Sequence, residues 1–489
     1  MQLYVLFISL SSFALLLLMV LTFTIQPNTN FPKKSYLVYT QFLNDKQEKL
    51  IYSKEDVLLH NNEYNKQHPK PIANTTKNNK NEYYKDLRMD TEGIEDFKED
   101  NTHLYRNLFK IFRFTKPRKS VPVDFTDSLK SLPDECGGHL DALWLWVNGS
   151  EEKWVESVKK YKPDYDSARF RDYNTLLYSM RSVYKYAPYI KRYFLATADQ
   201  VPSYLNAPLG ETSFILKSHN TNQSKYSHAK QHKESVEDVY NNHRDKDLYT
   251  LELVSHSEFV NNKSLPLFNS DALESRIHHI KNLGNCFVYF NDDFLLARPT
   301  PISYFFKYGK VHRYCSIDYD AQKYAHVSQH QNSTSVANQL INKRFGLSKD
   351  TQHYFQSHVE YTLLKTSLLE LEMAFPVEFE KQQNLKFREF GAINMQHIAL
   401  HYMRYTGKAF QTFEMEWNYF FDFKINHNKN HESLFKINET EPYSVCINDA
   451  LNGYDNDPEA GDKEIRYVLR FLQRMLPEKT PFELDFKSK

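Results

Sequence analysis

Residues 287–296, FVYFNDDFLL, constrain the fold of this chain more than any other stretch. The apolar and aromatic residues are typical of a buried β-strand, and Asn291, Asp292 and Asp293 interrupt its far end. Adjacent carboxylates at the end of a buried strand are unfavourable unless a cation meets them, and a divalent metal that carries a pyrophosphate is a suitable cation. The alternative is a turn in which Asn and Asp cap the next element.

The composition admits one large domain or two of ordinary size. The 489 residues include 62 basic and 61 acidic side chains, a balance that does not favour binding to nucleic acid or to a membrane surface. Tyr and Phe number 34 and 35 whereas Gly numbers only 12, which argues against a disordered chain and against a Gly-rich phosphate loop. The sequence contains neither a P-loop nor a dinucleotide-binding fingerprint.

The N-terminal residues predict attachment to a membrane. Residues 3–25 are almost wholly apolar and carry no charge, which is long enough for a helix to span a bilayer. A cleavable signal peptide is the alternative, but its apolar core is normally shorter and preceded by positive charge. We therefore expect residues 1–26 to form a signal-anchor transmembrane helix. Lys33 and Lys34 leave the orientation open, because the positive-inside rule alone places them in the cytoplasm.

Sequons and cysteines bear on the compartment. An Asn-rich chain produces Asn-X-Ser/Thr triplets by chance, but they also suit a lumenal protein, and they occur at Asn74, Asn148, Asn222, Asn262, Asn332 and Asn438. None of the four cysteines belongs to a CxxC pair, so disulfides in an oxidising lumen are compatible with the sequence and zinc is not expected. They are Cys136, Cys286, Cys315 and Cys446.

Two polar stretches mark the organisation of the chain. Residues 27–120 are rich in Asn and Lys, and we expect a partly disordered stem, with an interaction segment as the alternative. Residues 218–247 are predicted to be a polar surface insertion whose histidines are solvated rather than metal ligands. The insertion lies within a single domain that spans residues 121–489.

A strand, a turn of small residues and a helix open the ordered part of that domain. Residues 140–147, LDALWLWV, are typical of a buried strand, and residues 151–160 favour a helix. Asn148, Gly149 and Ser150 form the turn between them. Nucleotides commonly lie at such a junction, although the tripeptide alone is weak support.

Two arginines and an aspartate precede the next predicted helix. Arg169, Arg171 and Asp172 come before apolar residues at helical spacing, and the helix is expected to end before Pro188. The helix dipole does not favour cations at this end, so their presence indicates an anionic partner. Pairing of Arg171 with Asp172 or another local carboxylate is the structural alternative. Residues 193–197, YFLAT, predict a second buried strand.

Further polar residues precede the central strand. Asn269 or Ser270 can cap a helix that continues to about residue 283. Glu274 and His278 lie four residues apart on that helix, which by default indicates an ordinary surface pair.

The last third of the chain contributes three more candidates. Residues 354–375 show helical periodicity that His358 interrupts early, and a core histidine is the usual interpretation of such a residue. Arg388 precedes a helix predicted over 392–405, where a solvated charge is usual. Asp449 follows a short apolar run that ends at Asn448.

These stretches, taken in order, resemble the four conserved regions of the Stealth family, which comprises bacterial capsular polysaccharide hexose-1-phosphate transferases and the α/β subunits of eukaryotic N-acetylglucosamine-1-phosphotransferase. LDALWLWVNGSEEKW resembles the first region. The second is divided between RFRDYNTLLYSMRSVYKYAPYIKRYFLATADQVPSYLN and SHSEFVNNKSLPLFNSDALESRIHHIKNLGNCFVYFNDDFLLARP. HYFQSHVEYTLLKTSLLELEMAFPVEFE with KFREFGAINMQHIALHYMRYTGKA resembles the third, and YSVCINDALN the fourth.

The resemblance implies an α/β fold, with a nucleotide-sugar-transferase-like mixed sheet flanked by helices and an added helical region. It implies transfer of a sugar-1-phosphate from a UDP-sugar, expected to be UDP-GlcNAc, to a hydroxyl of a glycan or glycoprotein, with release of UMP. The expected location is the Golgi membrane, as a single-pass type II protein with a lumenal catalytic domain, and a homodimer is left open. Fold analogy does not decide the reaction. A metal-dependent Golgi glycosyltransferase that releases UDP and a non-catalytic glycan-binding Golgi protein are the alternatives.

The resemblance also implies roles for individual residues. Mg²⁺ or Mn²⁺ would be held by Asp292, Asp293 and Asp449. His358 would be the base for the acceptor hydroxyl, and Arg171 and Arg388 would neutralise phosphate. The catalytic set is therefore Asp292, Asp293, His358, Arg388 and Asp449. The implied substrate-binding set, in which Asp141 and the 148–150 turn hold the uridine nucleotide, is Asp141, Asn148, Gly149, Ser150, Arg169, Arg171, Asp172, Asn269, Ser270, Glu274, Asn291 and Asn448.

Overall fold

The computed structural model describes Leu129 and residues 132–210, 212–217, 225–229, 247–315, 325–326, 328–412 and 418–484. Every described residue belongs to the unit Asp100–Lys489. The anchor predicted at 1–26 and the stem predicted at 27–120 lie outside the described residues. None of the helices in the described part is long and apolar enough to cross a membrane.

A mixed seven-stranded sheet forms the centre of the described unit, in the order β10-β6-β1-β2-β5-β3-β4. The strands β6, β1, β2 and β5 run parallel to one another. At the two sides of this group, β10 pairs antiparallel with β6, and β3 pairs antiparallel with β5 and with β4. The strands are Asp141–Trp146 (β1), Arg192–Thr197 (β2), Thr212–Lys217 (β3), Lys225–Ala229 (β4), Asp247–Ser255 (β5), Cys286–Asn291 (β6) and Tyr361–Leu364 (β10).

Continuous apolar runs explain why β1, β2 and β6 lie in the middle of this sheet. All six residues of β1 and of β2 are buried, as expected for parallel strands covered on both faces. Trp144 stacks on Phe290 of the neighbouring strand with ring centroids 5.1 Å apart, and its indole nitrogen donates to Ser179 Oγ at 2.8 Å. Ser179 belongs to α8 (Thr175–Tyr186), so this contact also joins a covering helix to the sheet.

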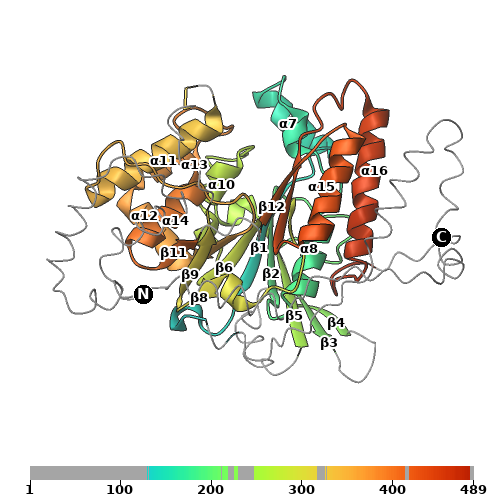
Figure 1. Ribbon diagram of the computed structural model, residues 1–489, viewed down its shortest axis with the longest axis horizontal. Coiled ribbons are helices and arrows are strands. Elements are labelled where there is room, and N and C mark those ends of the chain that lie inside the picture. Colours follow the sequence, from blue (N-terminus) through green and yellow to red (C-terminus); the bar gives the residue numbers. More distant parts are fainter. Residues whose placement is uncertain are drawn as a thin grey trace, which may run out of the picture. The chain divides into compact units, whose positions relative to one another are not determined.

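Helices cover the sheet in two groups (Figure 1). One group contains α8, α15 (His427–Thr440) and α16 (Pro458–Met475). The other is the added helical region, which α10 (Ser270–Glu274) adjoins: α11 (Gln329–Phe345), α12 (Lys365–Ala374), α13 (Pro376–Gln383) and α14 (Met395–Tyr405). The helix α7 (Glu152–Tyr161) follows β1. A mixed sheet flanked by helices, with an added helical region, confirms the predicted α/β class.

Two small sheets complete the fold. One has the order β12-β13-β7 and consists of Asn418–Phe423 (β12), Ser444–Asp449 (β13) and Phe294–Leu296 (β7). The other has the order β11-β9-β8 and consists of Ala409–Thr412 (β11), Lys310–Tyr314 (β9) and Phe306–Lys307 (β8).

Two predicted elements are wrong in detail. The run 287–296 is not one strand, because β6 ends at Asn291 and β7 begins at Phe294 in a different sheet. The run 354–375 is not one helix, because β10 occupies its middle before α12 begins at Lys365. Aromatic and β-branched residues such as Tyr361 and Thr362 suit a strand, and pairing with β6 outweighs the helical periodicity. The stretch predicted as a polar insertion, 218–247, contains the edge strand β4.

A disulfide links the approach to β1 with the start of β6. It joins Cys136 to Cys286, which are 150 residues apart, and Cys136 ends the 3-10 helix Asp134–Cys136 that precedes β1. Cys315 and Cys446 are buried free thiols. Stable disulfides form in oxidising compartments.

Removing this disulfide is expected to lower the free energy of unfolding by about 2 to 4 kcal/mol, because the bond closes a long loop of the unfolded chain. The double variant Cys136→Ala/Cys286→Ala, compared with the wild type by urea denaturation, tests this expectation. Wild type in reducing agent should match the variant, and the variant should be insensitive to reductant. Equal stability of wild type with and without reductant would contradict the expectation.

Candidate active site

Two sheets meet at the turn that carries Asn291, Asp292 and Asp293. The chain leaves the large sheet at the carboxyl end of β6 and enters the small sheet as β7. Asp292 and Asp293 form the turn between the two strands and belong to neither sheet. The turn is held on the far side by β13, since the backbone N–H of Ile447 donates to the carbonyl oxygen of Asp293 at 3.0 Å.

The same strand brings Asp449 to this turn. β13 pairs antiparallel with β7, with Cys446 opposite Phe294, and Asp449 is its last residue. Its carboxylate accepts two hydrogen bonds from Arg171 Nη1, at 2.7 and 3.0 Å, and one from the backbone N–H of Leu451 at 2.9 Å. The Arg171 guanidinium also lies over the ring of Tyr454, 4.3 Å from its centroid. The partner of Arg171 is therefore a remote carboxylate and not a local one.

Asp172 lies beside Arg171, and its carboxylate is fixed by other donors. Trp146, the last residue of β1, donates through its indole nitrogen at 3.2 Å, and the backbone N–H of Asn174 donates at 2.8 Å. Burial raises the pKa of Asp172, and these two hydrogen bonds lower it again in part. The side chains around the turn of Asp292 and Asp293 therefore come from three segments: the end of β1, the segment before α8 and the end of β13.

The resulting group of carboxylates carries excess negative charge. Burial raises the pKa of Asp292 well above its ordinary value, and the charge of Asp293 is the next largest cause. Asp172 and Asp449 raise it further. Burial also raises the pKa of Asp293 to about 7, although a hydrogen bond from Cys446 Sγ, 3.5 Å away, opposes the rise. A cation at this position would relieve the repulsion.

The donor set fits a divalent metal only in part. Asp293 Oδ1 is buried and has no hydrogen-bond partner in the described part of the chain, which suits a ligand oxygen. Asp292, Asp293 and Asp449 lie around the same turn, but their ligand oxygens do not all come within 4.8 Å of one another. Among the described residues, the three ligand groups that lie within 4.8 Å of one another are His278, His279 and Glu372. Mg²⁺ is commonly held by one or two carboxylates plus substrate phosphates, which Asp292 and Asp293 could supply while Asp449 holds Arg171.

The turn after β1 is hydrogen-bonded to the residue just past β2 and to the segment that carries Arg169 and Arg171. Gln200, just past β2, accepts from the backbone N–H of Asn148 at 2.9 Å and donates to its carbonyl oxygen at 3.0 Å. Asn148 Oδ1 accepts from the backbone N–H and the hydroxyl of Ser150. Gly149 donates to Phe170 O at 3.0 Å, and a Cβ there would lie 2.2 Å from that oxygen, so only glycine permits this approach.

Asp141 does not belong to the site, which corrects the prediction that it binds the nucleotide with the 148–150 turn. It is the first residue of β1 and pairs with Phe287, whereas Asn291 pairs with Leu145 near the other end of the strand. Its fully buried carboxylate accepts from the backbone N–H of Gly284 at 2.7 Å and lies 3.3 Å from Arg192 Nε. These contacts stabilise the amino ends of the strands.

A second group of polar residues gathers around Arg388. Its Nη2 donates to Ser270 Oγ at 2.8 Å and its Nε lies 3.5 Å from Asp271 Oδ2, while 45% of the side chain stays exposed. Asn269 caps α10 by accepting from the backbone N–H of Asp271, and its amide donates to the carbonyl oxygens of Leu385 and Phe387. Asn269 is buried, so it positions the Arg388 loop and is not available to a substrate, contrary to its predicted role.

His358 is exposed, which corrects its usual interpretation as a core histidine. Its Nδ1 lies 3.2 Å from the hydroxyl of Tyr361, and its ring packs edge-on against Phe294, the residue after Asp293, with centroids 5.1 Å apart. Desolvation and the charges of His330 and Arg388 lower the pKa of His358, and solvent contact offsets part of that lowering. A neutral imidazole beside the turn can accept a proton.

Glu274 lies behind the turn and not on a helix surface. The predicted pair with His278 is wrong, because α10 ends at Glu274 and His278 contacts Glu372 instead. Glu274 Oε1 lies 3.0 Å from the hydroxyl of Tyr289, and that hydroxyl lies 2.8 Å from Asn291 Oδ1. Because it is buried, Glu274 can act on a substrate only through Asn291, not by contact.

Two further predicted residues, Arg169 and Asn448, form contacts with nearby aspartates. Arg169 is half exposed and lies 3.6 Å from Asp166, and Asn448 donates to Asp422 on the adjacent strand at 3.0 Å. Gln200 and Tyr454 were missed as parts of the site. Gln200 carried a signal, because it follows a buried strand as Asn148 does, whereas Tyr454 lies in a polar loop that gave none.

Comparison with known proteins identifies related sequences. Residues 169–238 and 236–314 match the family profile described as Stealth protein CR2, conserved region 2. The capsular polysaccharide phosphotransferase SacB of Neisseria meningitidis serogroup A is 26% identical over 380 residues, which cover 73% of this chain and 59% of SacB. The capsular polysaccharide phosphotransferase fcs1 of Haemophilus influenzae is 29% identical over 326 residues, which cover 63% of this chain and 78% of that protein.

A third relative and one solved structure complete the comparison. The exopolysaccharide phosphotransferase SCO2594 of Streptomyces coelicolor is 27% identical over 356 residues, which cover 70% of this chain and 51% of the relative. The chain therefore spans between about half and three fifths of the length of this relative and of SacB. The crystal structure of the galactosyltransferase LgtC with donor and acceptor sugar analogs is 11% identical, covers 70% of this chain and 97% of LgtC, and has a TM-score of 0.29.

Proposed function

Because the chain belongs to the Stealth family, we propose that it transfers a sugar-1-phosphate from a UDP-sugar, with UDP-GlcNAc as the expected donor, to a hydroxyl of an acceptor glycan and releases UMP. The observation that carries this proposal is the meeting of Asp292 and Asp293 with the Arg171–Asp449 pair where three segments of the chain converge. Carboxylates next to a guanidinium suit a substrate that brings both phosphate charge and a metal ion.

The proposed reaction displaces UMP at the phosphorus that carries the sugar. The acceptor oxygen forms a bond to this phosphorus, the bond from the same phosphorus to the UMP oxygen breaks, and the anomeric bond stays intact. Negative charge develops on the phosphoryl oxygens and on UMP. When bound, Mg²⁺ or Mn²⁺ would neutralise that charge, and Asp292 and Asp293 would hold it.

The remaining roles follow from the position of each side chain. His358, exposed beside the turn, would take the proton from the acceptor hydroxyl. Arg388 keeps much of its guanidinium open to solvent and would contact a phosphate of the donor. The turn 148–150, fixed by Gln200, would hold the uridine end. These assignments put the nucleotide at the carboxyl ends of β1 and β6, where ligands of parallel sheets commonly bind.

The proposed location is the lumenal side of the Golgi membrane, as a type II protein. The Cys136–Cys286 disulfide supports an oxidising compartment, and the apolar run 3–25 supports an anchor. Protection of the body from protease in sealed vesicles, and its loss when detergent is added, would test that orientation.

The decisive experiment follows the β-phosphorus of the donor. The full chain is incubated with UDP-GlcNAc labelled at the β-phosphorus, with Mg²⁺ or Mn²⁺ and with a simple mannoside. Label in a phosphodiester-linked product together with UMP supports the proposal. Label that remains in released UDP identifies a glycosyltransferase instead. Metal-dependent binding of UDP-GlcNAc without turnover on any of a panel of glycan acceptors would favour a glycan-binding protein.

Arg171→Lys is expected to lower kcat/KM by about tenfold to a hundredfold. Lysine keeps the charge but cannot lie flat on Tyr454 while it bonds both oxygens of Asp449. Arg344→Lys is the control, because Arg344 is exposed in the last turn of α11 and belongs to none of the predicted site residues. Equal kinetics of the two variants in the β-phosphorus assay would argue against a role for the Arg171 guanidinium.

A further inference from the structure

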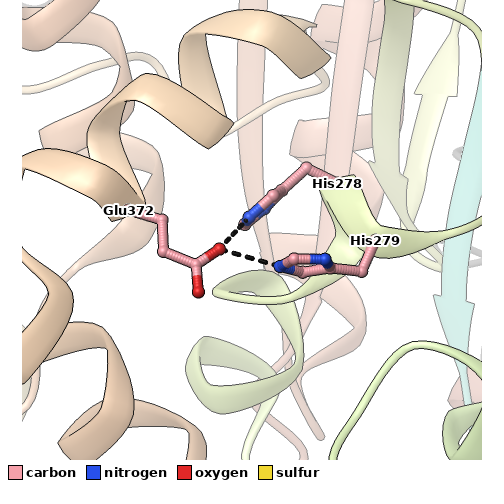
Figure 2. A group of neighbouring side chains, drawn as sticks. All are labelled: His278, His279 and Glu372. Atoms are coloured by element: carbon pink, nitrogen blue, oxygen red, sulfur yellow. Dashed lines mark hydrogen bonds and ion pairs between the residues drawn. The ribbon is translucent and has the colours of Figure 1, made fainter.

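Two consecutive histidines and a glutamate, none of them assigned to the proposed active site, point toward one another (Figure 2). His278 Nε2 and His279 Nε2 lie 2.6 and 2.8 Å from the same oxygen of Glu372, Oε2. The histidines belong to the 3-10 helix η7 (Ile277–His279), and Glu372 belongs to α12. We propose that this histidine–glutamate group binds a zinc ion. The site is independent of the proposed transferase chemistry.

The ligand atoms suit zinc better than the hard cations. Two imidazole nitrogens and one carboxylate oxygen form a common three-ligand zinc set, with a fourth position for water, whereas Mg²⁺ and Ca²⁺ prefer oxygen ligands only. The side chain of His278 is fully buried while those of His279 and Glu372 are 35% and 23% exposed. Solvent can therefore reach the ligand atoms from one side, which supplies an entry path and a place for the water.

The three ligand atoms already converge. Zinc binds a neutral ring nitrogen of a histidine and an ionised carboxylate. His278 Nε2 and His279 Nε2 both meet Glu372 Oε2, so the atoms that would bind the ion face one another.

Arg276 orients the carboxylate for this role. Its Nη1 bonds Glu372 Oε1, which leaves Oε2 directed at the two imidazoles. Carboxylate ligands of metals are commonly held in this way by a hydrogen bond to the second oxygen. Ligands about 2.0 to 2.1 Å from a tetrahedral ion lie roughly 3.3 Å apart, so binding requires an outward shift of about half an ångström. The partly exposed His279 and Glu372 side chains have room to make it.

The bound ion would fasten the added helical region to the sheet. η7 lies between α10, which carries Glu274, and β6, which ends at Asn291. α12 follows β10, which pairs with β6. A zinc ion between η7 and α12 would therefore hold together the segments that lead into the proposed active site, and its removal would loosen them without removing any residue of that site.

Zinc binding can be measured on the full chain produced without a polyhistidine tag. Metal content after dialysis against trace zinc, and the thermal midpoint with and without zinc, give two readouts that do not depend on activity. Cobalt(II) supplies a third, because its visible absorption is intense when it is bound in a four-coordinate site. His279→Ala and Glu372→Gln each remove one ligand, and both side chains are partly exposed, so the variants should fold.

His427→Ala is the matched control, because His427 also contacts a glutamate, Glu464 at 3.1 Å, but is not part of a described three-ligand group. We expect about one zinc per chain and a thermal midpoint raised by a few degrees in wild type and in His427→Ala. His279→Ala and Glu372→Gln should bind zinc at least tenfold more weakly. Wild type that binds no zinc, wild type that binds only iron(II), or variants that retain the ion at wild-type affinity would each overturn the proposal.

Discussion

Asp292→Asn is expected to reduce kcat/KM for sugar-1-phosphate transfer by about a thousandfold or more while leaving the protein as stable as the wild type or more stable. The loss is expected because Asn lacks the negative oxygen with which Asp292 would hold a divalent metal, which would supply neutralisation of the phosphoryl charge. Stability is retained because the substitution is nearly isosteric. The substitution also removes a carboxylate whose ionisation is opposed by burial and by the charge of Asp293.

The opposite signs of these two effects make the test specific. Activity is measured with the β-phosphorus label, and stability is measured by urea denaturation in the absence of metal. Asp350→Asn, an exposed aspartate in the loop after α11, is the control and should leave both quantities unchanged. A variant that is inactive and also unfolds more easily would indicate a structural role for Asp292. A variant that is active and stable would remove the central assignment.

The sequence predicts this carboxylate group well because its members follow recognisable strands. Apolar runs identify β1, β2 and β6, and polar residues directly after such runs lie at one edge of a parallel sheet. Asn148 and Asp292 follow β1 and β6 in this way, and these strands are parallel neighbours, so local pattern places the two residues near one another. Asp449 ends β13 in a different sheet, and local pattern does not place it.

Contacts between distant segments are what the sequence does not reveal. Arg171 and Asp449 are 278 residues apart, and local alternatives such as Asp172 looked equally good. Asp141 was assigned to the wrong end of its strand, because an acidic residue beside an apolar run gives no sign of whether Arg192 or a ligand neutralises it. The helical pattern 354–375 hid β10 because pairing with β6 is a tertiary effect.

The contact between Glu274 and Tyr289 is another that the sequence does not reveal, and it bears on whether the buried Glu274 carboxyl group is protonated. The hydroxyl of Tyr289 lies within hydrogen-bond distance of Glu274 Oε1 and of Asn291 Oδ1, yet it has one proton to donate. Both contacts are satisfied when Glu274 carries a proton and donates it to the hydroxyl, which then donates to Asn291. Burial raises the pKa of Glu274 to about 8, in agreement with this arrangement. Gln396 Nε2 donates to the other oxygen at 3.0 Å.

Glu274→Gln is therefore expected to stabilise the protein increasingly as the pH rises. A folded-state pKa of about 8 lies above the ordinary value of 4.5, so the proton on Glu274 stabilises the folded state at low pH, and this contribution is lost as the pH rises from about 4.5 through 8. Glutamine keeps the same donors and acceptors without the ionisation. The difference in unfolding free energy between variant and wild type should be small at pH 5 and on the order of 4 kcal/mol at pH 8.

Urea denaturation at pH 5, 6.5 and 8 measures this difference. Glu156→Gln, on the exposed face of α7, is the control and should follow the wild type at every pH. Transfer activity of Glu274→Gln should stay within a few fold of wild type near pH 7, because the neutral side chain still directs Tyr289 toward Asn291. A stability difference that does not change with pH would mean that Glu274 is ionised in the folded protein. Asn291 would then have to turn its amide toward the hydroxyl, and Asn291→Asp, which lacks that donor, should destabilise the protein most at high pH.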